Sequence, residues 1–296
     1  MTAGNGVELL PPSADIAQRR YALGPGVVVG SLGVTLASCP VGRMAVRARV
    51  TGPIAAVEAV MAFSNPYNEP LELFYLFALP RGASVSKFKA QIGGRLLEGK
   101  VFEKEVAQQQ YQIPTLPPFL VNLFSREYAP VFCVPLGKCQ AGENITIELA
   151  YAQFLTVSDM DFQFRFPLTT SPALIAGASL DGREQADASP IVASGLKAGP
   201  GLSIAVQLEV GAIVPQRVAC SQACQVHKLQ NGDISVELSK QNELTARDFI
   251  VSYRYGDMRN PQSFLRVGQR HFMLNVIPPW ERPQNTLPRD LIILLD

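Results

Sequence analysis

The sequence has few residues of the types that most often carry chemistry. Its 296 residues include two His and one Trp, and charged residues make up 17%. The net charge of +1 shows no bias that would attract a polyanion, which argues against nucleic-acid binding. No apolar run reaches the ~18 residues that a transmembrane helix needs. With two histidines and no Gly-x-Ser-x-Gly elbow, we expect the chain not to be an enzyme.

The first eighteen residues lack the basic start and apolar centre of a secretory signal, which favours a cytoplasmic protein. A minority alternative is a lipid-anchored surface protein, because Leu36-Ala37-Ser38-Cys39 resembles the cleavage box of bacterial lipoproteins. The five cysteines are odd in number and do not form a dense framework, so we expect most of them to be reduced, buried thiols. A Cys133–Cys139 or Cys220–Cys224 bridge stays open for an exported chain.

Hydrophobic residues, by contrast, make up 47% of the chain, and the sequence also contains 23 Gly and 23 Pro. These turn-forming residues separate many short apolar or alternating runs. Such a pattern is typical of an all-β, β-sandwich-like protein with little helix. The length suggests about two domains.

The best-patterned stretch runs from Phe63 to Tyr111. A strand stops at Asn65-Pro66, and Leu71–Leu79 is apolar at both parities, which predicts a strand buried on both faces. Alternation over residues 87–92 predicts a strand with one buried face. Residues 101–112 then show helical i, i+4 spacing and predict the one short helix.

Further strands are expected on both sides of this stretch. Residues 1–24 lack periodicity and are expected to form a flexible arm. The strands expected outside the stretch and before residue 158 are Val27–Leu36, Met44–Val50, Ala56–Phe63, Val131–Leu136 and Ile145–Tyr151.

This order of elements resembles the VIT domain, named after vault protein and the inter-alpha-trypsin inhibitor heavy chains. The resemblance covers about residues 28–157 and implies a VIT-like β domain at 25–157. The matching residues are Phe63, Asn65, Pro66, Pro70, Leu71, Phe77, Leu79, Pro80, Gly82, Val85, Phe88, Gly94, Glu98, Gly99, Glu103, Lys104, Ala107 and Tyr111. The Gly142-Glu143 turn and the strand ending on Tyr151 match the end of such a domain. The proline-rich residues 113–124 depart from the family's usual loop.

Residues 158–282 predict a second β-sandwich-like region. Alternating apolar residues indicate strands at Phe162–Phe166, Ile204–Val210, Phe249–Tyr255 and Phe272–Val276. The Asn231-Gly232 pair predicts a β-hairpin with a tight primed turn. Spacing leaves open whether the two regions share sheets.

Residues 287–296 resemble the first strand of a von Willebrand factor type A domain, truncated in this chain. In that family the Asp at this strand's end is the first ligand of a metal-ion-dependent adhesion site. The resemblance therefore implies that Asp296 begins an incomplete site. Mg²⁺ or a similar ion is expected only with a complete A domain, so this chain alone is expected to hold no cofactor.

Cys220, Cys224 and His227 are ligand types for Zn²⁺ and support an alternative, a zinc-binding or hydrolytic enzyme. A structural zinc site needs four ligands, and no second cysteine pair follows. A set of aromatic residues is expected in the core rather than in a ligand pocket: Phe74, Tyr75, Phe77, Phe119 and Phe124. The resemblance implies a non-enzymatic scaffold or protein-interaction module with unidentified protein partners.

Overall fold

A computed structural model describes most of the predicted strands. The residues it describes are 2–3, 7–9, 27–32, 35–39, 41–80, 82–100, 131–158, 161–168, 201–209, 215, 217–239, 248–254 and 260–279. All regular elements among these residues are β-strands, which confirms the all-β fold class. The predicted helix at 101–112, Phe119, Phe124 and the segment 287–296 lie outside the described residues.

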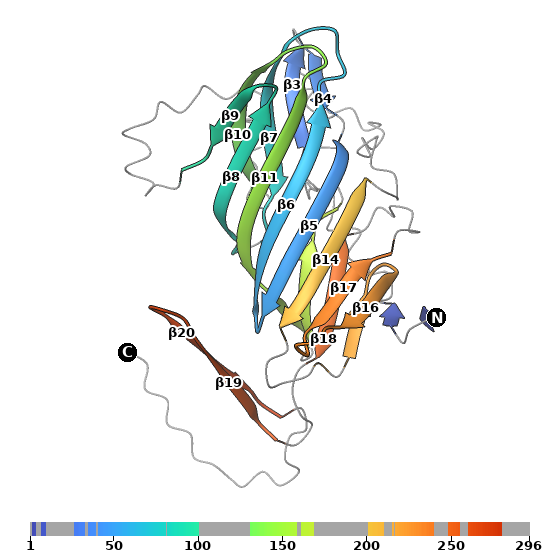
Figure 1. The fold of residues 1–296 in the computed structure, drawn as a ribbon, viewed down its shortest axis with the longest axis vertical. Coiled ribbons are helices and arrows are strands. Elements are labelled where there is room, and N and C mark those ends of the chain that lie inside the picture. The colour runs from blue at the N-terminus through green and yellow to red at the C-terminus, as the bar shows by residue number, and fades with distance from the viewer. Residues whose placement is uncertain are drawn as a thin grey trace, which may run out of the picture.

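An eight-stranded sheet forms the largest layer of the molecule (Figure 1). In order across the sheet it contains β16 (Cys224–Lys228), β17 (Ile234–Leu238), β14 (Leu202–Glu209), β5 (Val41–Thr51), β6 (Ile54–Ser64), β11 (Asn144–Phe154), β8 (Ser84–Ile92) and β9 (Arg95–Glu98). Its central strands alternate as predicted, with Val46, Ala48 and Val50 buried while Arg47 and Arg49 are exposed. One face therefore covers a core and the other faces solvent.

A four-stranded sheet packs against the inner face of this layer. It contains β10 (Val131–Cys139), β7 (Leu71–Ala78), β3 (Val27–Leu32) and β4 (Thr35–Cys39), in that order. β7 is buried at every position from Leu73 to Phe77, which confirms the prediction that both its faces are covered. The prediction of one strand over Val27–Leu36 is wrong. Leu32 pairs with Thr35, a two-residue spacing that turns the chain back and makes β3 and β4 an antiparallel hairpin.

The buried side chain of Asn65 explains why the Asn-Pro turn before β7 has this sequence. Its Nδ2 donates to Glu69 O and Gln140 O, both at 3.0 Å, and its Oδ1 accepts from Tyr67 N at 3.0 Å. One amide thus satisfies backbone groups from the turn before β7 and from the β10–β11 turn.

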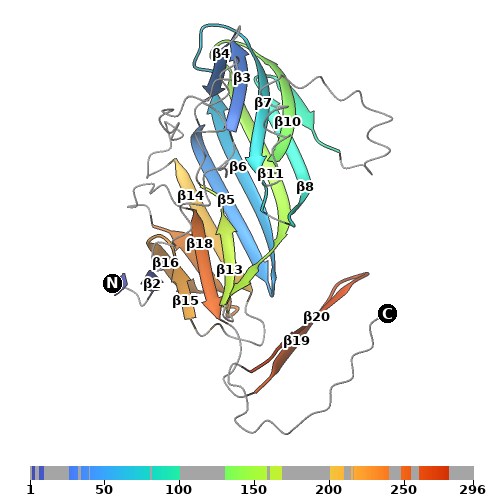
Figure 2. The same cartoon turned by 180° about the vertical axis from the view of Figure 1, so that it is seen from behind.

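A six-stranded sheet lies beside the four-stranded one against the same large layer (Figure 2). Its order is β1 (Thr2–Ala3), β2 (Val7–Leu9), β15 (Arg217–Cys220), β18 (Phe249–Arg254), β13 (Asp161–Phe166) and β12 (Thr156–Ser158). β1 and β2 belong to the predicted flexible arm, but β2 pairs in parallel with β15, with Glu8 opposite Ala219. This part of the arm is therefore a strand, because β15 offers it an open edge.

The two β regions share the large sheet. β14 pairs in parallel with β5 at eight positions, from Leu202 opposite Met44 to Glu209 opposite Thr51. The core is also continuous, since the rings of Phe77 and Phe166 lie 6.3 Å apart. The boundary between regions 25–157 and 158–282 stays a prediction, and a continuous sheet crosses it.

The hairpin predicted at Asn231-Gly232 joins β16 to β17, but its turn differs from the predicted two-residue type. The Leu229 amide donates to Asp233 O at 2.7 Å, which leaves a three-residue loop with Gly232 at φ 89°. Asn231 Oδ1 accepts from the Asp233 amide at 3.1 Å. This side-chain bond and the positive φ of Gly232 fit a longer loop.

β19 (Gln262–Val267) and β20 (Phe272–Ile277) form a separate two-stranded sheet at the lower end of the molecule (Figure 1). No helix occurs among the described residues, so none there is long and apolar enough to span a membrane.

Candidate interaction surface

The β19–β20 hairpin has regular antiparallel geometry. Six residue pairs run from Gln262 opposite Ile277 to Val267 opposite Phe272. At the turn, the Gly268 amide donates to His271 O at 2.7 Å. Regular pairing fixes which side chains share a face, because facing residues project to the same side of a sheet.

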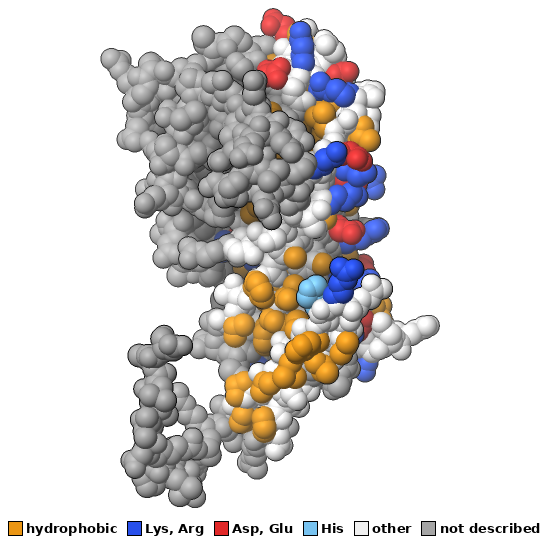
Figure 3. Space-filling view, turned by 90° about the vertical axis from the view of Figure 1, so that its left-hand side faces the viewer, with side chains coloured by type: hydrophobic (Ala, Val, Ile, Leu, Met, Phe, Trp, Pro, Cys, Tyr) orange, Lys and Arg blue, Asp and Glu red, His pale blue; other side chains and the backbone are white. Residues whose placement is uncertain are grey.

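One face of this hairpin is apolar and open to solvent. Leu265 faces Leu274, Val267 faces Phe272, and Val276 lies on the same face two residues beyond Leu274. Their exposed fractions are 58% for Leu265, 75% for Val267, 74% for Phe272, 59% for Leu274 and 65% for Val276. Figure 3 shows hydrophobic side chains gathered over this part of the molecule. A contiguous exposed apolar face of this kind typically marks a binding surface.

Few described contacts hold the hairpin against the body of the protein. Ile277, at the end of β20, is buried and belongs to the main core. On β19, Arg266 Nη2 lies 3.5 Å from Glu209 Oε2. A two-stranded hairpin alone is only marginally stable in water, so this hairpin needs a covering layer to be rigid.

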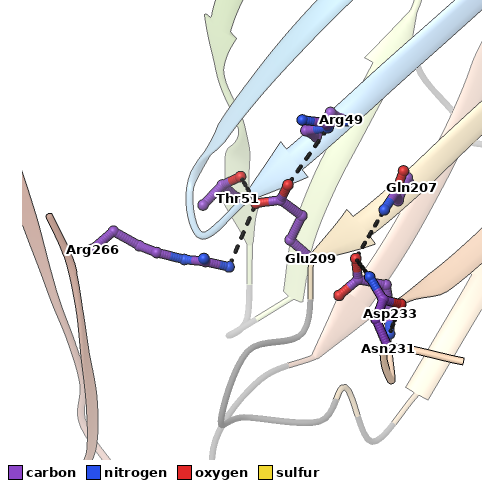
Figure 4. Close-up of polar contacts among 7 residues, drawn as sticks. All are labelled: Arg49, Thr51, Gln207, Glu209, Asn231, Asp233 and Arg266. Atoms are coloured by element: carbon purple, nitrogen blue, oxygen red, sulfur yellow. Dashed lines mark hydrogen bonds and ion pairs between the residues drawn. The ribbon is translucent and has the colours of Figure 1, made fainter. Parts of the chain in front are cut away.

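Glu209 is the junction between the hairpin and the shared sheet (Figure 4). It accepts a hydrogen bond from Thr51 Oγ1 at 2.5 Å, and its Oε1 lies 3.5 Å from Arg49 Nε. The hydrogen bond crosses the β14–β5 pair, while the ion pairs to Arg49 and Arg266 are long and partly exposed. The ion pair to Arg266 is the one that reaches the hairpin, and an exposed pair of this kind stabilises it by less than about 1 kcal/mol.

The predicted ligand group does not converge in the structure. Cys220 and Cys224 are buried, whereas His227 is exposed and stands three residues beyond Cys224 on β16. Positions three apart in a strand point to opposite faces, so the imidazole turns away from the thiols. Among the residues that the structure describes, no three His, Cys, Asp or Glu side chains are grouped to hold a metal ion. Asp296 lies outside that part of the chain.

All five cysteines carry free thiols in the structure, and four of them are buried. Burial is the first cause of the raised pKa of Cys39, to about 12, and of Cys133 and Cys139, to about 11 each. These three thiols are therefore neutral, weak nucleophiles at physiological pH. Cleavage before Cys39, as the lipid-anchor alternative requires, would remove β3 from beside β7.

The aromatic residues of β7 are core residues, as predicted. Tyr75 and Phe77 are fully buried, and their rings contact Phe88 and Tyr151 of the opposite sheet at 5.7 Å each. Sequence reasoning placed a strand at Phe272–Val276 but missed the surface it forms. Its alternation is visible in the sequence, but alternation does not tell whether the apolar face is covered.

Comparison with known proteins identifies the first β region. Residues 41–151, from the start of β5 to Tyr151 in β11, match the family model of the vault protein inter-alpha-trypsin domain. This part of the chain is a VIT domain, as the sequence predicted.

Two human proteins are similar to the chain over this region. Protein mono-ADP-ribosyltransferase PARP4 is 28% identical over 133 residues, which are 45% of this chain and 8% of that protein. Von Willebrand factor A domain-containing protein 5A is 24% identical over 146 residues, or 48% of this chain and 19% of that protein. The chain thus spans less than a fifth of the length of either relative.

Among solved structures, the M1 zinc metallopeptidase of Deinococcus radiodurans is 14% identical, with a TM-score of 0.36. The match covers 84% of this chain and 48% of the peptidase. A likeness at that score bears on neither the fold nor the function of this chain.

Proposed function

We propose that the chain is a non-enzymatic interaction module whose β19–β20 hairpin docks onto a von Willebrand A domain in the same polypeptide. The observation that carries the proposal is the apolar hairpin face, with Val267 and Phe272 about three-quarters exposed. The VIT domain at 41–151 and the similarity to an A domain-containing protein support the class.

Chain connectivity favours an A domain as the occupant of this face. β20 ends at Ile277, and the segment that resembles the first A-domain strand has its aliphatic run at Leu291–Leu295. The connection over residues 278–290 spans at most about 47 Å at up to about 3.6 Å per residue. An A domain begun by that segment is therefore held beside the hairpin at high effective concentration.

The apolar face also suits a covalently linked partner. Burying these side chains would contribute roughly 25 cal/mol for each Å² removed from water. Because the connection is short, little of that free energy is lost to translational and rotational entropy. Metal-dependent adhesion belongs in this proposal to the A domain, where Asp296 would be the first ligand of its Mg²⁺ site. The β body would act as its rigid support.

Hydrogen–deuterium exchange tests the proposal on two proteins, residues 1–296 and a longer protein in which the same residues continue into a complete von Willebrand A domain. The amides of residues 262–277 are expected to exchange rapidly in the shorter protein and at least tenfold more slowly in the longer one. Amides of the β5–β6 pair are the internal control and are expected to exchange equally in both.

Serine substitutions on the apolar face of the β19–β20 hairpin test whether this face makes the contact with the A domain. In the longer protein, the double variant Phe272→Ser, Leu274→Ser is expected to restore rapid exchange of the hairpin without changing the Tm of the body. Phe154→Ser is the matched control, since Phe154 is 67% exposed but lies at the end of β11. Equal hairpin exchange in both proteins would overturn the proposal. So would dimerisation of residues 1–296 through Phe272, which would make a second copy the occupant.

A further inference from the structure

Cys220 and Cys224 stand on either side of a crossing between two sheets. Cys220 is the last residue of β15 in the six-stranded sheet, and Cys224 is the first residue of β16 in the eight-stranded sheet. Backbone hydrogen bonds fix both ends of the connection. The Ser221 amide donates to Ile250 O at 2.9 Å, and the Ser239 amide donates to Ala223 O at 3.0 Å.

The two side chains meet inside the core. Cys220 is fully buried and Cys224 is 6% exposed, and both belong to the main hydrophobic cluster. Cys224 Sγ donates to Gln222 O at 3.3 Å, and the Cys220 thiol raises the pKa of Cys224. Both side chains point into one core from strand ends four residues apart, and a disulfide bond of about 2.05 Å needs their Cβ atoms only about 3.5–4.5 Å apart.

We propose that Cys220 and Cys224 form a reversible disulfide that clasps the six-stranded sheet to the eight-stranded sheet when the protein meets a low-molecular-weight disulfide. The Cys224 thiolate attacks the small disulfide, forms a mixed disulfide and releases one small thiolate. The Cys220 thiolate then attacks the Cys224 sulfur and releases the second. The protein loses two hydrogens and two electrons, and the small disulfide is reduced to two thiols.

The surroundings of the pair make this exchange slow. The hydrogen bond with Cys220, and then burial, raise the pKa of Cys224, so the attacking thiolate is scarce at neutral pH. Oxidation therefore requires local opening at the sheet crossing. The same burial slows the reduction of the disulfide by small thiols, so the reverse reaction also depends on local opening. The inference is independent of the proposed docking function.

The test incubates folded residues 1–296 with oxidised glutathione at pH 8.5 and then alkylates the protein under denaturing conditions. Of the five thiols, three are expected to be labelled, and peptide mass spectrometry is expected to place the bridge between Cys220 and Cys224. A parallel refolding in a glutathione redox buffer removes the barrier of local opening and is expected to give the same bridge.

The functional readout is stability that depends on reductant. The oxidised protein is expected to melt about 3–6 °C higher than the reduced one, because closing even a short loop restricts the unfolded chain. Cys224→Ser is expected to lose the shift, and Cys133→Ser, which changes a half-buried cysteine, is expected to keep it. Five labelled thiols after oxidative refolding, or a bridge to another cysteine, would overturn the proposal.

Discussion

The VIT sheet and the β19–β20 hairpin follow the same alternating pattern but place their apolar side chains in opposite environments. In β5, Val46 and Val50 are 1% and 0% exposed, whereas in the hairpin Val267 and Val276 are 75% and 65% exposed. The difference lies in what faces each strand rather than in the strand itself. Alternation therefore tells which side chains share a face of the sheet. Whether that face is buried depends on whether a second layer packs against it.

The largest expected effect compares the same substitution in the two regions. Phe77→Ala is expected to lower the free energy of unfolding by about 3–5 kcal/mol, since it opens a cavity beside Tyr75, Tyr151 and Phe166. Phe272→Ala on the exposed hairpin face is expected to change it by less than about 0.5 kcal/mol. Urea unfolding of both variants measures the difference, and similar losses would show that the hairpin is covered in this chain.

A second prediction concerns a buried polar group of the VIT domain. Asn65→Ala is expected to cost about 2–3 kcal/mol, because Glu69 O, Gln140 O and the Tyr67 amide each lose a hydrogen bond in a buried turn. Asn231→Ala, at an exposed turn, is the control and is expected to cost about 0.5–1 kcal/mol. Equal losses in urea unfolding would mean that Asn65 is replaceable by water.

Removing the hydroxyl groups of two buried tyrosines separates the effect of a hydrogen bond between the two β regions from the effect of ring packing. Tyr253 Oη donates to Gly52 O at 3.1 Å and so joins the six-stranded sheet to the β5–β6 turn. Tyr253→Phe is therefore expected to cost about 1 kcal/mol. Tyr151 Oη is buried without a hydrogen-bond partner among the described residues, so Tyr151→Phe is expected to be neutral or slightly stabilising. Thermal unfolding of both variants checks the pair, and the reverse order would contradict it.

The smallest expected effect depends on pH. A hydrogen bond from Lys89, together with its charge, lowers the pKa of Glu98 on the solvent face of the large sheet. The ion pair thus adds stability above the usual pKa of Glu, and this is lost as the pH falls through the lowered value. Glu98→Gln is expected to be slightly less stable than the wild type at neutral pH and equal to it in acid. Tm measured against pH tests this, and a difference that grows in acid would be the wrong sign.

Much of the local structure could be predicted from the sequence. The apolar run of β7 predicted burial on both faces, and Asn231-Gly232 predicted a hairpin, because both depend on neighbouring residues. The parallel pairing of β14 with β5 could not be predicted, since strand spacing does not encode which distant edge is open. For the same reason, β2 was expected to be part of a flexible arm.

The candidate sites divide in the same way. The four-residue spacing of Cys220 and Cys224 made their proximity predictable, and strand parity could have excluded His227 from the group. The exposed face of the hairpin could not be inferred from Phe272, Leu274 and Val276, because an identical pattern is buried elsewhere in the chain. Exposure depends on which other elements pack against the face, and the periodicity of the sequence carries no information about that.

During synthesis, β5 cannot pair with β14 until most of the chain has been made. The hydrogen bond between Thr51 and Glu209 joins residues 158 positions apart. At 5–20 residues per second, β5 waits roughly 8–30 s on the ribosome before its partner emerges. During that interval its open edge is a template for wrong pairing, and the exposed Arg47 and Arg49 repel another copy of the same strand. Charges on the solvent face of the folded sheet thus also hinder pairing between nascent chains that are translated from the same mRNA.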